Sequence, residues 1–173
     1  MILKVARLGN PVIRKPCEPV PKEAITSADM RRLIDDMIDT MREYDGVGIA
    51  APQVHVSKQL AVIEVTRQMR IEKPIPLTVL VDPRILAMAK TQLHEWEGCL
   101  SVNDLRGKVP RAEWVDVEAF TRTGEKVKFR AEGFFARVIQ HECDHLAGKV
   151  FLDRMPDLST LSHLHEFARY RQE

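Results

Sequence analysis

The chain lacks most features that would mark a membrane protein, a disulfide scaffold or a nucleic-acid-binding protein. Among its 173 residues the net charge is only +1, so no general excess of positive charge attracts nucleic acid, and we expect no direct nucleic-acid readout. No uninterrupted apolar stretch approaches the length that spans a bilayer, so we expect no membrane partner. Internal repeats and low-complexity tracts are also missing, which excludes a repeat architecture.

Cysteine is scarce, and its distribution is informative. The three residues Cys17, Cys99 and Cys143 are an odd number and lie far apart in the sequence, which argues against a disulfide framework and suits a reducing compartment. Residues 1–5 do not start a long apolar secretory signal, nor do they start an Arg/Ser-rich organellar leader. We therefore expect a soluble cytoplasmic protein, or an organellar one whose leader has been removed.

What is present is an ordinary globular composition, with 45% hydrophobic and 29% charged residues. A chain of this length can bury a sizeable core without disulfides or structural metals. We therefore expect one catalytic domain over residues 1–173.

Three segments are predicted to be helical. After a proline-rich start, Thr-x-x-Asp at Thr26 resembles a capping box, and apolar residues follow at the helical period as far as Asp45-Gly46. A second helix is predicted from Gly133 to Ala147, with Gly148 as its C-terminal stop. A last helix is predicted over residues 157–170.

The middle of the chain is predicted to form strands, because short runs rich in Val, Ile and Leu alternate with turn residues. The predicted fold class is α+β: mainly antiparallel strands packed around a central helix, with an N-terminal and a C-terminal helix. The candidate strands are Leu60–Val65, Leu77–Val81, Lys90–Glu97, Trp114–Phe120 and Lys126–Ala131.

The run His141-Glu142-Cys143-Asp144-His145 carries the clearest chemical information. On a helix, positions four apart share one face, so both imidazoles can reach a single metal ion. Glu142 follows the first histidine and is placed to act as a base beside the metal. A catalytic metal site usually takes three protein ligands and leaves one position open, so a third ligand is required.

Three candidates for that ligand follow from the residues alone. The long zincin pattern needs a histidine where this chain has Phe151, so that reading fails. Glu166 is a downstream carboxylate in a predicted helix, and Cys99 is a thiol in the run Glu-Gly-Cys-Leu-Ser. Cys143 is turned about 200° from each histidine on the helix and is expected to pack as a small hydrophobe.

A run of small residues extends from Gly46 to Gln53, with the sequence GVGIAAPQ. Its spacing does not match a phosphate-binding loop, and no Lys-Ser or Lys-Thr pair follows. The run is predicted to be a glycine-rich turn that brings the backbone close to a ligand, with Gln53 as an amide donor.

These three runs together resemble peptide deformylases. The motifs G-x-G-x-A-A-x-Q, E-G-C-x-S and Q-H-E-x-D-H of that family match residues 46–53, 97–101 and 140–145 in the same order. The resemblance covers most of the chain. It implies that Cys99, His141 and His145 bind the metal and that Glu142 is the general base.

The resemblance also implies roles around the metal. Gln53 and the backbone N–H of Leu100 would stabilise the developing oxyanion. Glu97 would pair with Arg111 as structural support at the substrate site. The remaining substrate-binding residues implied are Val47, Gly48, Arg106, Phe134 and Val138.

The activity implied is removal of the N-formyl group from the formyl-methionine of nascent polypeptides, with release of formate. By its ligand types alone, a Cys-His-His site predicts zinc. The resemblance instead implies Fe²⁺, with Zn²⁺, Ni²⁺ or Co²⁺ as substitutes. A transient ribosome contact is a further implied partner, although this chain lacks the long basic C-terminal helix of some members. Two departures from some relatives are Asn103 and Arg137.

Overall fold

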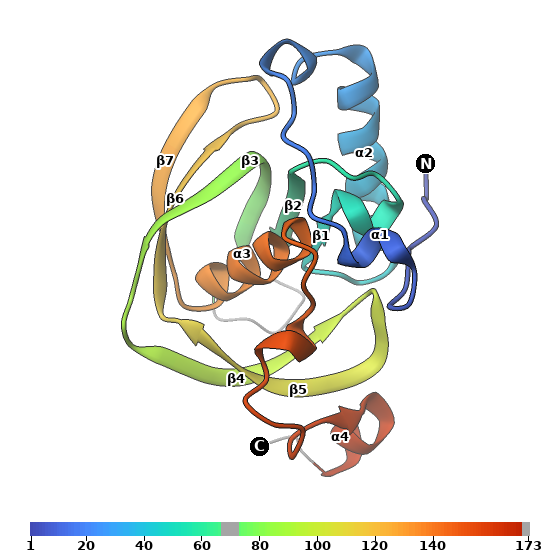
Figure 1. Cartoon of the computed structure of the whole chain (residues 1–173), viewed down its shortest axis with the longest axis vertical. Coiled ribbons are helices and arrows are strands. Elements are labelled where there is room, and N and C mark those ends of the chain that lie inside the picture. The colour runs from blue at the N-terminus through green and yellow to red at the C-terminus, as the bar shows by residue number, and fades with distance from the viewer. Residues whose placement is uncertain (67–72, 171–173) are drawn as a thin grey trace.

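The computed structural model describes residues 1–66 and 73–170, and it confirms the predicted α+β fold (Figure 1). Its helices are α1 (Pro11–Arg14), α2 (Ala28–Glu43), α3 (Gly133–Leu146) and α4 (Leu164–Tyr170). Its strands are β1 (Gly48–Ala50), β2 (Leu60–Val65), β3 (Ile75–Met88), β4 (Gln92–Cys99), β5 (Val102–Ala112), β6 (Trp114–Phe120), β7 (Lys126–Glu132) and β8 (Ser162–His163). Short 3-10 turns cover Lys22–Ala24, Ala51–Val54 and Phe151–Arg154.

The strands form two antiparallel sheets. One has five strands in the order β1-β2-β3-β6-β7, and the other has three in the order β4-β5-β8. Helix α3 lies between them and contacts β1, β2, β5, β6 and β7 (Figure 1). In the described part of the chain, no helix is both long and apolar enough to cross a bilayer.

Helix α2 packs one apolar face against β1 and β2. Met30, Ile34, Met37 and Met41 are buried on this face in a core with Ile49, Leu60 and Val62 of the sheet. The helix begins one residue later than predicted from Thr26. Its N-cap is Ser27, because the Ser27 hydroxyl accepts a hydrogen bond from the backbone N–H of Met30 at 3.2 Å.

Helix α3 is buried on several sides, since it is covered by both sheets. Ala136, Val138 and Ile139 pack into a core with β3, β6 and β7. The predicted stop is confirmed: the helix ends at Leu146, and Gly148 has a φ of +72°. A side chain at Gly148 would collide with the carbonyl of Arg14, so only glycine fits this turn.

The structure corrects several boundaries. The strand predicted over Leu77–Val81 extends from Ile75 to Met88, and Gly48–Ala50, predicted as part of a turn, is strand β1. Strand β5 was not predicted, because Gly107, Pro110 and several charged residues lower its strand propensity. It forms because residues 107–112 and Val102 pair with β4, while Leu105 and Arg106 pair with β8. The last helix begins at Leu164 rather than at residue 157, after a turn and the short strand β8.

Candidate metal centre and active site

Three side chains from two elements converge at one point. Cys99 ends strand β4, while His141 and His145 lie one turn apart on α3, and one ligand atom from each lies within 4.8 Å of the others. Sγ of Cys99 and Nε2 of His145 are 3.2 Å apart. A single ion with bond lengths of about 2.0–2.3 Å can reach donors this close together. The donor set, one thiol and two imidazoles, therefore fits a transition-metal ion.

A buried carboxylate orients His141. Oε2 of Glu97 lies 2.9 Å from Nδ1 of His141, which leaves Nε2 as the ring nitrogen available to a metal. Glu97 also accepts hydrogen bonds from Arg111 at 2.9 and 3.1 Å, so the predicted Glu97–Arg111 pair is confirmed. Burial by itself raises the pKa of Glu97, but the hydrogen bonds from His141 and Arg111 hold it well below its usual range.

The electrostatics of the cluster favour a thiolate at Cys99. Burial alone would raise the pKa of this thiol, but the charges and hydrogen bonds of His145 and His141 hold it well below its usual range. A metal ion would act in the same direction, since only the thiolate is a ligand. Nδ1 of His145 is buried and has no hydrogen-bond partner in residues 1–66 and 73–170.

Glu142 lies beside the ligands in a dry environment. Burial raises the pKa of its carboxyl to about 7, against the opposing effect of His141 and His145. Its Oε2 is buried and makes no hydrogen bond within the described residues. A Cβ at Gly48 would collide with Oε1 of Glu142, so the second glycine of the GVG run is needed for space. A carboxyl with such a pKa and a free oxygen is suited to proton transfer.

Gln53 is held rigidly next to the thiol. Its Oε1 accepts a hydrogen bond from the backbone N–H of Ala50 at 2.8 Å, which fixes the orientation of the amide. Its Nε2 lies 3.2 Å from Oγ of Ser101 and 3.6 Å from Sγ of Cys99. The backbone N–H of Leu100, the residue after Cys99, donates no hydrogen bond to another backbone group in the described chain. Both N–H donors therefore lie close to the metal ligands.

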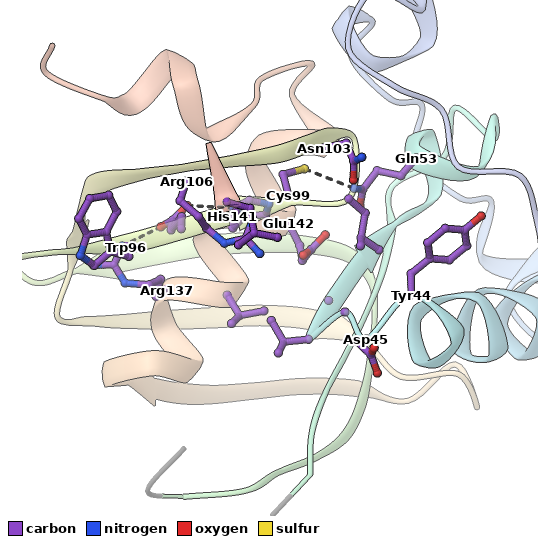
Figure 2. Close-up of a pocket in the computed structure, with 18 of the residues that line it drawn as sticks. Tyr44, Asp45, Gln53, Trp96, Cys99, Asn103, Arg106, Arg137, His141 and Glu142 are labelled. Atoms are coloured by element: carbon purple, nitrogen blue, oxygen red, sulfur yellow. Dashed lines mark hydrogen bonds and ion pairs between the residues drawn. The ribbon is translucent and has the colours of Figure 1, made fainter. Parts of the chain in front are cut away.

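A cavity of about 450 Å³ is lined by Cys99, His141, Glu142 and Gln53 (Figure 2). The predicted substrate-binding residues Val47, Gly48, Glu97, Arg106, Phe134 and Val138 all line it, together with Cys99, His141 and Glu142. Other residues of the cavity wall were not predicted from the sequence, because they belong to no motif and come from separate elements. They include Tyr44, Asp45, Trp96, Asp104 and Leu164.

The two departures noted in the sequence also line the cavity. Asn103 is exposed and donates a hydrogen bond to Asp104 at 2.6 Å. Arg137 is buried, with a side chain only 4% exposed, and donates to Oε1 of Glu97 at 2.7 Å and to the carbonyl of Leu93 at 2.6 Å. Its charge is thus neutralised within the protein, as a buried guanidinium requires.

Two polar residues of the motifs have structural partners that sequence reasoning did not predict. Gln140 hydrogen-bonds the backbone N–H and carbonyl of Ala112, tying α3 to β5. Asp144 is buried and pairs with Arg111 and Arg154, both at 2.6 Å. Asp144 lies on the face of α3 that is turned away from the cavity. In the sequence, its position on a helix predicted to be central was the only sign that it needs charged partners.

The other positions considered for the third ligand do not join the metal-ligand cluster. Phe151 is buried, and its ring is stacked on His141 with centroids 6.5 Å apart. Glu166 is exposed on α4 and is not part of the ligand cluster. Cys143 packs among apolar residues, and burial raises the pKa of its thiol to about 12, as expected for a small hydrophobe.

A Cys-His-His ligand set with an adjacent buried glutamate, on an α+β frame, defines a metal-dependent hydrolase. Residues 2–160 match the family model described as polypeptide deformylase. Peptide deformylase 2 of Pseudomonas putida is 38% identical over 165 residues, which is 94% of this chain and 93% of that protein. The chain therefore belongs to the polypeptide deformylase family and is an enzyme of that family.

Other relatives agree in sequence and structure. The peptide deformylase of Halothermothrix orenii is 42% identical over 154 residues, or 89% of this chain and 94% of that protein. The Met-Ala-Ser-bound class I type b peptide deformylase of Acinetobacter baumannii has a TM-score of 0.86 and 39% identity, covering 90% of this chain and 99% of that one. The Thermotoga maritima peptide deformylase has a TM-score of 0.81 and 34% identity, covering 91% of this chain and 99% of that one.

Proposed function

We propose that this enzyme acts on N-formyl-methionyl nascent polypeptides with Fe²⁺ held by Cys99, His141 and His145. The observation that carries the proposal is the convergence of these three ligands beside Glu142 and Gln53. The bound Met-Ala-Ser of the Acinetobacter baumannii relative supports a peptide substrate that begins with methionine. The three free cysteines suit a reducing, cytoplasmic location.

The bound ion would supply Lewis acidity, which lowers the pKa of a coordinated water and polarises a carbonyl oxygen. In our proposal Glu142 takes the proton of the attacking water at Oε2, which has no hydrogen-bond partner among the described residues. Water oxygen adds to the formyl carbon, and the carbon–nitrogen bond then breaks. Glu142 delivers the proton to the leaving amine, so formate and a free amino terminus are the products.

Gln53 and Leu100 are proposed to stabilise the oxygen that becomes negative during this attack. The Gln53 amide is already oriented by Ala50 and Ser101, so little reorganisation is needed when charge develops. Arg106 and Glu97 line the same cavity and are proposed to flank the route of the substrate. The peptide backbone is proposed to lie along Gly48, with the methionine side chain between Val47, Phe134 and Val138.

The test is formate release from formyl-Met-Ala-Ser by protein purified without oxygen and reconstituted separately with Fe²⁺ and Zn²⁺. We expect rapid release with iron, slower release with zinc and none from the acetyl analogue. Glu142→Gln should keep one metal per chain and lose turnover, whereas Cys99→Ser should lose metal affinity. Full turnover by Glu142→Gln would overturn the assignment of the base, and equal rates with both metals would overturn the preference for iron.

A further inference from the structure

The C-terminal segment, residues 155–170, lies beside strand β5 (Figure 1), and its Leu164 lines the cavity. Strand β8 pairs with β5, with Arg106 opposite Ser162 and Leu105 opposite His163. The backbone N–H of Lys108 donates to the Thr160 hydroxyl at 3.0 Å. The segment is therefore attached by backbone pairing to the strand that carries Arg106.

Glycine in β5 allows close packing of this segment. A Cβ at Gly107 would lie 2.6 Å from both Sδ and Cε of Met155, a distance that no real side chain tolerates. Farther along, the ring of Phe167 meets Trp96 edge to face, with centroids 4.8 Å apart. This geometry is favourable for aromatic pairs. Side-chain packing thus reinforces the backbone pairing.

The result is a wall of the active-site cavity built by residues far apart in sequence. Leu164 of α4, Trp96 of β4 and Arg106 of β5 line the same cavity as Cys99 and His141. In Figure 2, Trp96 lies at one end of the labelled residues and Tyr44 and Asp45 at the other, with Cys99 and His141 between them. The cavity, about 450 Å³ in volume, therefore extends beyond Cys99 and His141 toward Trp96.

The end near Trp96 is suited to the downstream part of a peptide. Burial lowers the pKa of Arg106, and its guanidinium donates to the carbonyl of Leu105 at 2.8 Å without a carboxylate partner in the described chain. Its other N–H groups are available to a main-chain carbonyl. Leu164 is 37% exposed, so apolar surface is available beside that cation. Asp45 lines the cavity and lies toward the opposite end of the labelled residues (Figure 2), and its carboxylate cannot donate to a carbonyl.

We propose that Trp96 and Leu164, positioned by the C-terminal segment, form an apolar subsite for the second or third side chain of the substrate. The proposal rests on the proposed function, because it needs a formylated peptide in the cavity. It predicts that a leucine or phenylalanine downstream of formyl-methionine increases kcat/KM through a lower KM.

The experiment compares formyl-Met-Ala-Ser with formyl-Met-Leu-Ser and formyl-Met-Ala-Leu on the iron-loaded enzyme. The wild type should prefer at least one leucine peptide by a factor on the order of ten in kcat/KM. Leu164→Ser should reduce that ratio to near one by raising KM for the leucine peptide, and Leu164→Met should keep the ratio. The matched control is Leu158→Ser, because Leu158 is 64% exposed in the same segment and does not line the cavity.

The outcomes separate this proposal from the one it rests on. No formate from any of the three peptides would overturn the proposed function, and the subsite with it. Formate release from all three at equal kcat/KM would overturn the subsite alone. A leucine preference that persists in both Leu164→Ser and Trp96→Ala would also overturn the subsite proposal alone. Thermal unfolding checks that both variants are folded.

Discussion

Oε2 of Glu97 lies 2.9 Å from Nδ1 of His141, and the same carboxylate accepts hydrogen bonds from Arg111 and Arg137. One buried carboxylate therefore orients a metal ligand and accepts hydrogen bonds from two buried guanidinium groups. The side chains of Glu97 and Arg111 are each 5% exposed, so water cannot replace any partner that is removed.

Glu97→Gln should weaken metal binding and destabilise the fold. Loss of the charged hydrogen bond to His141 is expected to reduce metal affinity about 10–100-fold. Removing the carboxylate from Arg137, and leaving Arg111 with Asp144 alone, should cost about 3–5 kcal/mol of unfolding free energy. Metal titration and urea unfolding of the metal-free protein measure the two effects. Glu95→Gln is the control, because Glu95 is 57% exposed, and equal effects of both substitutions would contradict this role.

Gly48→Ala should disable the proposed general base. The added Cβ would collide with the carboxylate of Glu142, which must move away from the metal centre. We expect turnover to fall about 100-fold or more, since general-base catalysis contributes on the order of 10²–10⁴. Steady-state kinetics and metal content are the measurements. Normal kcat with a full metal complement would show that Glu142 need not occupy its position in this structure.

Gln53→Glu should remove an oxyanion donor while keeping the local fold. A glutamate retains the oxygen that accepts from the Ala50 N–H, but when ionised it cannot donate a hydrogen bond. We expect kcat to fall by a factor on the order of 10²–10³. Ser101→Ala is the comparison, since it removes only the acceptor that orients Nε2 of Gln53, and its effect on kcat should be much smaller. A loss confined to KM would contradict the assignment.

The ion pair between Glu64 and Arg42 should make stability depend on pH in the acid range. Two hydrogen bonds of 2.7 and 2.9 Å join β2 to the last turn of α2, and they lower the pKa of Glu64. A carboxyl with a depressed folded pKa stabilises the protein above its unfolded pKa of about 4.3, and this contribution is lost as pH falls through the folded pKa.

Urea unfolding of wild type and Glu64→Gln at pH 7 and pH 3 tests this dependence. Arg42 is 54% exposed, so the difference at pH 7 should be only about 0.2–1 kcal/mol. The difference should shrink at pH 3. A gap between the two proteins that grows on acidification would have the wrong sign.

Much of the fold could be predicted because local patterns agree with the tertiary structure. Strands β2 and β6 have the predicted boundaries, and α3 begins at Gly133 as predicted. In β6 the buried residues alternate with half-buried ones, whereas β2 is a short, mostly apolar run that is buried almost throughout. Strand β5 could not be predicted in this way. Its residues favour turns, and it becomes a strand through its pairing with β4 and β8.

The C-terminal segment shows the same limit. The helical pattern over residues 157–170 was real only from Leu164 onward. The residues before Leu164 form a turn and then pair with β5. The edge of β5 offers hydrogen-bond partners to their backbone N–H and C=O groups. The contact of Phe167 with Trp96, 71 positions earlier in the chain, has no signal in a single sequence.

The spacing of His141 and His145 was sufficient to identify the metal-binding face of α3, because residues four apart place both imidazoles on one side of a helix. It left the third ligand open between Cys99 and Glu166. The tertiary structure decided for Cys99, since strand β4 ends against α3 while Glu166 is exposed on α4. It also decided how the charges are compensated, by bringing Glu97, Arg111 and Arg137 together. Helical spacing is a local property, whereas these contacts join residues 14 to 46 positions apart and form only when the sheets close around the helix.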